Sequence, residues 1–196
     1  MSGGHEALVI LDFGSQYTQL IARRVRELGV YSEILPFHTS LDDVLARKPS
    51  GIVLGGGPES VYGEDAFDVD PALFDAGVPV LGICYGMQAM MHHLGGEVAP
   101  ADHAEYGPAT IRPIDAGSVL FRGLDEEQLV WESHGDRVLR VPDGFVQVAE
   151  SANAPFSAVE DRARRLFGVQ FHPEVQHTPN GATVLRNFLF DACGFT

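Results

Sequence analysis

One of the two cysteines in the chain lies between two glycines, in the stretch Gly-Ile-Cys-Tyr-Gly at 82–86. An apolar run precedes this stretch and helix-forming residues follow it, so Cys84 falls where a buried strand would meet a helix. The pattern is that of a nucleophile elbow with cysteine in place of serine. In such an elbow a sharp turn exposes the nucleophile, and the following helix helps to stabilise a thiolate. The competing interpretation is that Cys84 is a small buried hydrophobe, the commoner fate of a free cysteine.

A histidine and a carboxylate end a second strand-like stretch, Gly-Val-Gln-Phe-His-Pro-Glu at 168–174. Strand spacing puts His172 and Glu174 on one side, and Pro173 fixes its own φ angle. A thiol nucleophile needs a base, and the base needs a group that orients it. Cys84, His172 and Glu174 supply all three. The alternatives are an ordinary surface histidine, or a metal ligand pair that lacks an identifiable third ligand.

Oxyanion stabilisation has two candidate donors. The backbone N–H of Tyr85, directly after the nucleophile, would point to where an oxyanion forms. A glycine-rich turn at 54–60 follows another predicted strand, and it fits neither a P-loop nor a dinucleotide fingerprint. On its own this turn is typical of a plain connection. Beside Cys84 it becomes a candidate for a second donor.

Alternating strand and helix patterns must position these residues. A parallel sheet with helices on both faces follows from that alternation, so we expect an α/β fold with a flavodoxin-like open, mostly parallel sheet. In the second half the predicted strands are shorter, and we expect them to extend the sheet or to form a smaller, largely antiparallel one. We interpret residues 1–196 as one domain. The predicted strands are 7–13, 30–37, 51–58 and 78–84, and the predicted helices are 17–29, 40–47, 71–77, 85–96 and 179–193.

Composition excludes several function classes. The net charge of −14 would repel phosphate backbones and anionic membranes, so we expect no nucleic-acid or membrane partner. Two cysteines without a CxxC pair predict neither a disulfide framework nor a metal site. The apolar runs are too short to span a bilayer, and residues 1–8 do not look like a signal peptide. A reducing cytoplasm is therefore the expected location.

Three motifs in this order resemble those of class I glutamine amidotransferases, and the resemblance runs over nearly the whole chain. They are Gly-Gly-Gly-Pro at 55–58, Gly-Ile-Cys-Tyr-Gly-Met-Gln at 82–88 and Phe-His-Pro-Glu at 171–174. The stretches at 10–27 and 131–136 are similar to the glutaminase domains of glutamine-hydrolysing GMP synthetases. Related domains of other amidotransferases resemble the chain less in these two stretches.

The resemblance implies a role for each matching position. Cys84 would attack the side-chain amide of glutamine, His172 would take the thiol proton and later protonate ammonia, and Glu174 would orient His172. The N–H groups of Gly57 and Tyr85 would form the oxyanion hole. The implied substrate contacts are Gln88 and the backbone around Ser133, His134 and Gly135.

The same resemblance implies a partner. The ammonia would pass to an ATP-pyrophosphatase domain or subunit that aminates XMP to GMP, with ATP and Mg²⁺ bound there and no cofactor in this chain. With 196 residues there is no room for that domain, so we expect either a domain of a longer chain or a separate subunit. The alternatives are the glutaminase component of another amidotransferase, a stand-alone cysteine hydrolase, or an inactive regulatory subunit.

Overall fold

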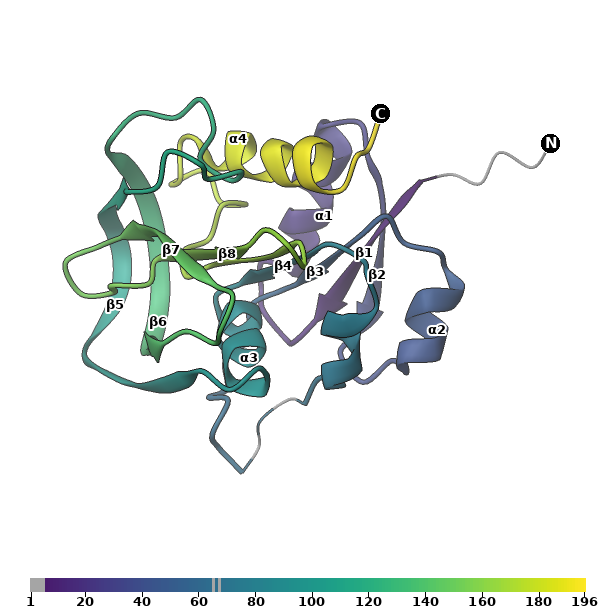
Figure 1. The fold of residues 1–196 in the computed structure, drawn as a ribbon, viewed down its shortest axis with the longest axis horizontal. Helices are drawn as coiled ribbons and strands as arrows, with labels where there is room; N and C mark the ends of the chain where they lie inside the picture. The colour runs from purple at the N-terminus through teal and green to yellow at the C-terminus, as the bar shows by residue number, and fades with distance from the viewer. Residues whose placement is uncertain (1–5, 65, 67) are drawn as a thin grey trace.

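The computed structural model describes residues 6–64, 66 and 68–196 (Figure 1). Part of the stretch on which the signal-peptide argument rests, residues 1–5, lies outside the described residues. The described strands form one nine-stranded mixed sheet in the order β2-β1-β3-β4-β9-β8-β7-β5-β6. The helices pack on its two faces. This arrangement confirms the expected α/β fold with a mostly parallel core.

The parallel half contains five neighbouring strands, and all of its pairings are parallel. Its strands are β1 (Ala7–Asp12), β2 (Tyr31–Pro36), β3 (Gly51–Leu54), β4 (Val80–Ile83) and β9 (Leu166–Val169). The three central strands β3, β4 and β9 are buried along their whole length. Continuous apolar sequence therefore produces strands covered on both faces, as expected for this pattern.

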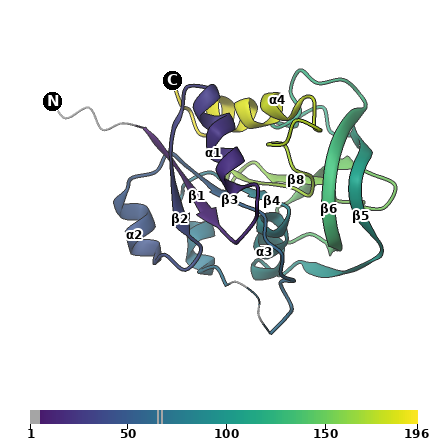
Figure 2. The ribbon, with the colours of Figure 1, turned by 180° about the vertical axis from the view of Figure 1, so that it is seen from behind.

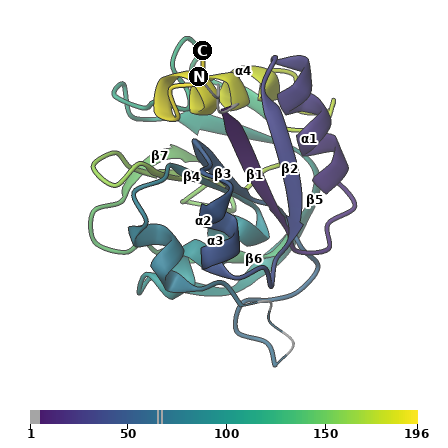
Figure 3. The ribbon, with the colours of Figure 1, turned by 90° about the vertical axis from the view of Figure 1, so that its right-hand side faces the viewer.

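Two groups of helical segments cover the two faces, and alternate residues of β1 face each group. Leu8 and Ile10 pack with α1 (Thr18–Glu27), α4 (Gly181–Arg186) and η2 (Asn187–Ala192). Val9 and Leu11 pack with α2 (Leu41–Ala46), the 3-10 turn η1 (Pro71–Asp75) and α3 (Tyr85–His93). Figure 3 shows the strands between these two layers. The core thus lies on both sides of the sheet.

In the second half of the chain, two strands are longer than the sequence predicts. The strands β8 (Ala158–Asp161) and β7 (Val146–Glu150) extend the sheet, but β5 (Glu97–Pro113) and β6 (Gln128–Arg140) have 17 and 13 residues. They pair antiparallel in a long ribbon at one end of the molecule (Figure 2). Prolines and glycines inside β5 are typical of turns, which is why the sequence predicts shorter strands here. A register shift between Pro100 and Glu105 accommodates the irregular stretch within the strand.

Among the described residues, no helix is both long and apolar enough to cross a membrane.

Candidate active site

Cys84 lies at the sharp turn between β4 and α3. Its backbone has a φ angle of 55° and a ψ angle of −110°, outside the regions that residues with a side chain normally occupy. The turn is fixed by the Cys84 N–H, which donates to the carbonyl oxygen of Val169 at 2.8 Å. The side chain is largely buried, with 5% of the residue exposed. The strained elbow that the sequence pattern predicts is therefore present.

The two glycines of the elbow are required by close backbone approach. A Cβ atom on Gly86 would lie 2.2 Å from the carbonyl oxygen of Leu54, and one on Gly82 would lie 2.6 Å from the backbone nitrogen of Met87. Both distances are far below van der Waals contact. The first residues of α3 therefore pass directly over β3 and β4, which holds Cys84 at the carboxyl end of the sheet.

The strain at Cys84 leads to a prediction about stability. Glycine adopts a positive φ angle without steric cost, whereas alanine does not. A non-glycine residue in such a conformation destabilises the folded state by about 1–3 kcal/mol. A glycine there removes this strain, but it also raises the entropy of the unfolded chain, which cancels part of the gain in stability. We expect the Cys84→Gly variant to have a free energy of unfolding about 1 kcal/mol higher than Cys84→Ala, measured by urea denaturation. A less stable glycine variant would contradict the strain.

His172 and Glu174 lie just beyond the end of β9, the strand next to the one that leads to Cys84. His172 Nδ1 donates to Glu174 Oε1 at 2.6 Å, and Cys84 and His172 line the same hollow. The His172 backbone is held by its N–H, which donates to the Trp131 carbonyl oxygen at 3.0 Å, and by its own carbonyl, which accepts from Thr178 Oγ1 at 2.7 Å. The three residues predicted as a triad thus lie together, with His172 hydrogen-bonded to Glu174.

The charge state of His172 follows from these contacts. Burial alone would lower its pKa, but the interactions with Cys84 and with the Glu174 carboxylate raise the pKa of His172 well above 6.5. The imidazole therefore keeps its proton to a higher pH than a free histidine does. Its contribution to the free energy of unfolding is complete below the ordinary pKa and is lost as the pH rises through the folded-state pKa.

A hollow of about 410 Å³ opens beside Cys84 and brings together the other residues predicted for the site. The Ser133 carbonyl oxygen lies 3.5 Å from Cys84 Sγ, and Gln88 Nε2 donates to the Asp136 carbonyl oxygen at 3.2 Å. The sequence-predicted residues in its wall are Gly57, Cys84, Tyr85, Gln88, Ser133, His134 and Gly135. A second hollow of about 290 Å³ reaches Cys84 from another side and is lined by Gly14, Ser15, Gln16, Tyr17 and His172, among others.

Gly57 must be a glycine where it stands. A Cβ atom there would lie 2.7 Å from the Phe13 carbonyl oxygen. The glycine-rich turn after β3 therefore packs tightly against the end of β1 and reaches the wall of both hollows. This close packing distinguishes the turn from a plain connection.

Gln170 is a site residue to which the sequence argument assigns no role. Its Nε2 lies 3.7 Å from Cys84 Sγ, and its Oε1 accepts a hydrogen bond from Gln88 Nε2 at 3.2 Å. A signal is present in the sequence, because Gln170 precedes His172 by two residues and therefore shares its side of an extended chain. The His134 side chain, in contrast, is hydrogen-bonded to Glu105 and lies 3.0 Å from a carboxylate oxygen of Glu132, both on the β5–β6 ribbon.

The whole arrangement matches one family of enzymes. The family model for class-I glutamine amidotransferases matches residues 9–192, and the chain belongs to this family. It is 56% identical over 186 residues to the GMP synthase [glutamine-hydrolyzing] of Campylobacter lari, covering 95% of this chain and 36% of that protein. It is 53% identical over 192 residues to the protein of the same name from Streptococcus thermophilus, with 96% and 36% covered. The chain thus spans about a third of the length of these curated relatives.

Solved structures support the same assignment. A Thermoplasma acidophilum protein described as one subunit of a GMP synthase superposes with a TM-score of 0.83 and 32% sequence identity, covering 96% of this chain and 94% of that one. A glutamine amidotransferase from Thermotoga maritima superposes with a TM-score of 0.76, covering 97% and 99% of the two chains. The second protein is only 19% identical, so it supports the fold alone.

Proposed function

We propose that this chain hydrolyses the side-chain amide of glutamine to glutamate and ammonia, with Cys84 as nucleophile, His172 as general acid and base, and Glu174 as the residue that orients His172. The observation that carries the proposal is Cys84 at a strained strand-to-helix turn, in the same hollow as a buried His172 that is hydrogen-bonded to Glu174. Family membership supports glutamine as the amide.

The proposed reaction proceeds in two halves. His172 takes the proton of the Cys84 thiol, and the sulfur attacks the amide carbon to form a tetrahedral intermediate. The proton on His172 then passes to the departing nitrogen, so that ammonia leaves and a γ-glutamyl thioester remains. Water then attacks the thioester carbon and gives a proton to His172. Cleavage of the carbon–sulfur bond releases glutamate and restores the sulfur and the protonated imidazole. Throughout both halves, Glu174 accepts a hydrogen bond from the Nδ1–H group of His172.

The surrounding residues are proposed to bind the substrate. The backbone N–H groups of Gly57 and Tyr85 form the oxyanion hole, because both residues border Cys84 in the larger hollow. Gln88 and the backbone of Ser133, His134 and Gly135 bind the α-amino and carboxylate groups of glutamine. A hollow of about 410 Å³ accommodates one amino acid of this size.

We further propose that residues 1–196 form one glutaminase domain whose ammonia is used by an ATP-pyrophosphatase domain or subunit. There XMP is aminated to GMP with ATP and Mg²⁺. Two observations support this partner: the relatives are named as glutamine-hydrolysing GMP synthases, and this chain spans about a third of their length. The solved relative from Thermoplasma acidophilum has nearly the same extent and is described as one subunit, which is consistent with a partner on a separate chain.

The test is glutamate release from glutamine by this chain, with and without an added ATP-pyrophosphatase domain, ATP, Mg²⁺ and XMP. We expect release to increase when the partner and all of its substrates are present, and the matched control omits only XMP. Release that ignores the partner would indicate a glutaminase of another pathway. No release from glutamine, together with cleavage of simple thiol-protease esters, would instead favour a stand-alone cysteine hydrolase.

A further inference from the structure

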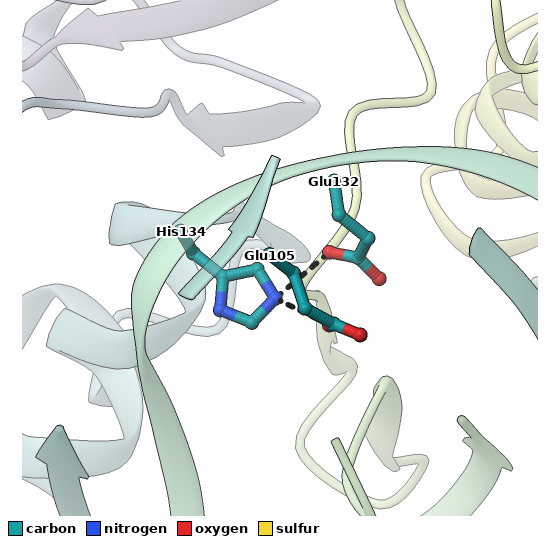
Figure 4. A group of neighbouring side chains, drawn as sticks. All are labelled: Glu105, Glu132 and His134. Carbon is teal, nitrogen blue, oxygen red and sulfur yellow. Dashed lines mark hydrogen bonds and ion pairs between the residues drawn. The ribbon is translucent and has the colours of Figure 1, made fainter. Parts of the chain in front are cut away.

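Three ionisable side chains gather on one face of the β5–β6 ribbon (Figure 4). Glu105 is paired directly opposite His134 across the two strands, and Glu132 precedes His134 by two residues on β6. Strand geometry therefore places all three on the same side. His134 Nε2 lies 3.1 Å from Glu105 Oε2 and 3.0 Å from Glu132 Oε2. The residue opposite Glu132 is Gly107, which contributes no side chain to this face.

The hydrogen bonds around the cluster fix the protonation of the imidazole. His134 Nδ1 lies 2.6 Å from the Asp136 carbonyl oxygen, which can only accept, so Nδ1 carries a proton. Nε2 is left to face two carboxylate groups. One N–H on Nε2 can serve only one of them, and a bare Nε2 lone pair beside two carboxylates would be repelled. The cluster therefore contains more hydrogen-bond acceptors than N–H groups that can donate to them.

Glu132 is the member of the cluster whose carboxylate lacks a hydrogen-bond donor among the described residues. The Glu105 carboxylate is held from outside the cluster by Asn153, whose Nδ2 donates to Oε1 at 2.9 Å. Glu132 has 1% of its surface exposed, and among the described residues neither of its carboxylate oxygens accepts a hydrogen bond. A buried carboxylate that accepts no hydrogen bond lacks the compensating positive charge that such a group needs. A cation would supply that charge.

We propose that Glu105, Glu132 and His134 bind a divalent transition-metal ion, Zn²⁺ by preference, through Nε2 and one oxygen of each carboxylate. The three ligand atoms lie within 4.8 Å of one another. Tetrahedral ligands about 2.1 Å from one ion are separated by about 3.4 Å, and the two histidine–carboxylate distances of 3.1 and 3.0 Å are close to this. One imidazole nitrogen with two carboxylates suits Zn²⁺ better than Mg²⁺. Binding releases the Nε2 proton, while Nδ1 keeps its hydrogen bond to a backbone carbonyl, the usual support of a metal-bound histidine.

An ion bound at His134 would lie next to the wall of the candidate active site. His134 lies between Ser133, whose carbonyl contacts Cys84 Sγ, and Asp136, whose carbonyl accepts from Gln88. An ion joining β5 to β6 at His134 would fix this segment of the pocket wall. It would therefore stabilise the ribbon against unfolding and restrict the motion of the wall beside Cys84.

The test is Zn²⁺ titration calorimetry at pH 7.5 in a Cys84→Ala background, which removes the thiol–imidazole pair as a competing metal site. We expect one ion per chain. Glu132→Gln and Glu105→Gln should each weaken binding by at least about tenfold, because each removes a charged ligand. The matched control is His93→Asn, which removes an imidazole that pairs with exposed Asp68 at 3.1 Å. It should leave the affinity unchanged, and Mg²⁺ should give no comparable heat.

Two results would overturn the site: no stoichiometric Zn²⁺ binding in the Cys84→Ala protein, or binding that persists in both glutamine variants. Circular dichroism shows whether these variants fold. If one does not, ¹⁵N NMR of the Cys84→Ala protein replaces it. There Zn²⁺ must shift the Nε2 resonance of His134, and an unshifted resonance means that the cluster only shares protons.

Discussion

The Cys84→Ala variant is expected to lose glutamate release by a factor of at least about 10³, because no other group can form the thioester. Its free energy of unfolding should stay close to that of the wild type, since alanine keeps the Cβ atom and occupies the same strained backbone. The measurement is a coupled glutamate dehydrogenase assay at saturating glutamine, with urea denaturation of the same preparation.

Cys193 provides the matched control for this experiment. It is the other free cysteine, and it lies at the C-terminal end of η2, with its Sγ against β3 at Gly51. Burial raises the pKa of its thiol, which makes it a poor nucleophile. Cys193→Ala should keep its activity within about twofold. Retained activity in Cys84→Ala, or lost activity in a folded Cys193→Ala, would refute the assignment of the nucleophile.

The Glu174→Gln variant is expected to lower kcat by a factor of about 10²–10³. The amide keeps the size of the side chain but removes the charge that lies 2.6 Å from His172 Nδ1. Its NH₂ group can also hold the imidazole in the wrong tautomer. The kcat value should fall with little change in KM, because Glu174 acts through His172 and does not line the larger hollow.

A pH titration separates this electrostatic role from a merely structural one. The negative charge of Glu174 helps to raise the pKa of His172, so its removal should lower that pKa in an NMR titration. The stability that protonated His172 supplies should then be lost at a lower pH than in the wild type. The control is Glu150→Gln, at a surface ion pair with Arg112, and it should leave the pKa of His172 unchanged. An unchanged pKa in Glu174→Gln would contradict the role of the carboxylate.

The parallel half of the fold can be predicted from sequence because its local signals agree with its packing. Each central strand is a short apolar run, and each lies between two helical layers. Ser40 shows the agreement at a helix start, because its Oγ accepts from the Asp43 N–H at 3.1 Å at the beginning of α2. The β5–β6 ribbon cannot be predicted in the same way. Its length depends on cross-strand pairing through positions such as Gly107 and Pro108, which locally favour turns.

In the candidate site, too, some residues can be predicted from local sequence and others cannot. Cys84, His172 and Glu174 can be found from sequence because each lies at a strand end within a recognisable short motif, and the structure brings all three together. The contact of Glu105 with His134 has no such local signal. It depends on the register of two strands and on a shift within β5, and neither can be read from the spacing along the chain.

The place of β9 in the sheet has a consequence for how the chain acquires its structure. The strand pairs with β4 on one side and β8 on the other, and the Gln170–Cys84 contact just beyond it joins residues 86 positions apart. A nascent chain that has not yet completed residues 166–169 therefore leaves β4 as an apolar strand with one unpaired edge. Contacts of this range form slowly, and open edges recruit other chains. We therefore expect fragments that end before β9 to aggregate, and the thiol and the imidazole to meet only late in folding.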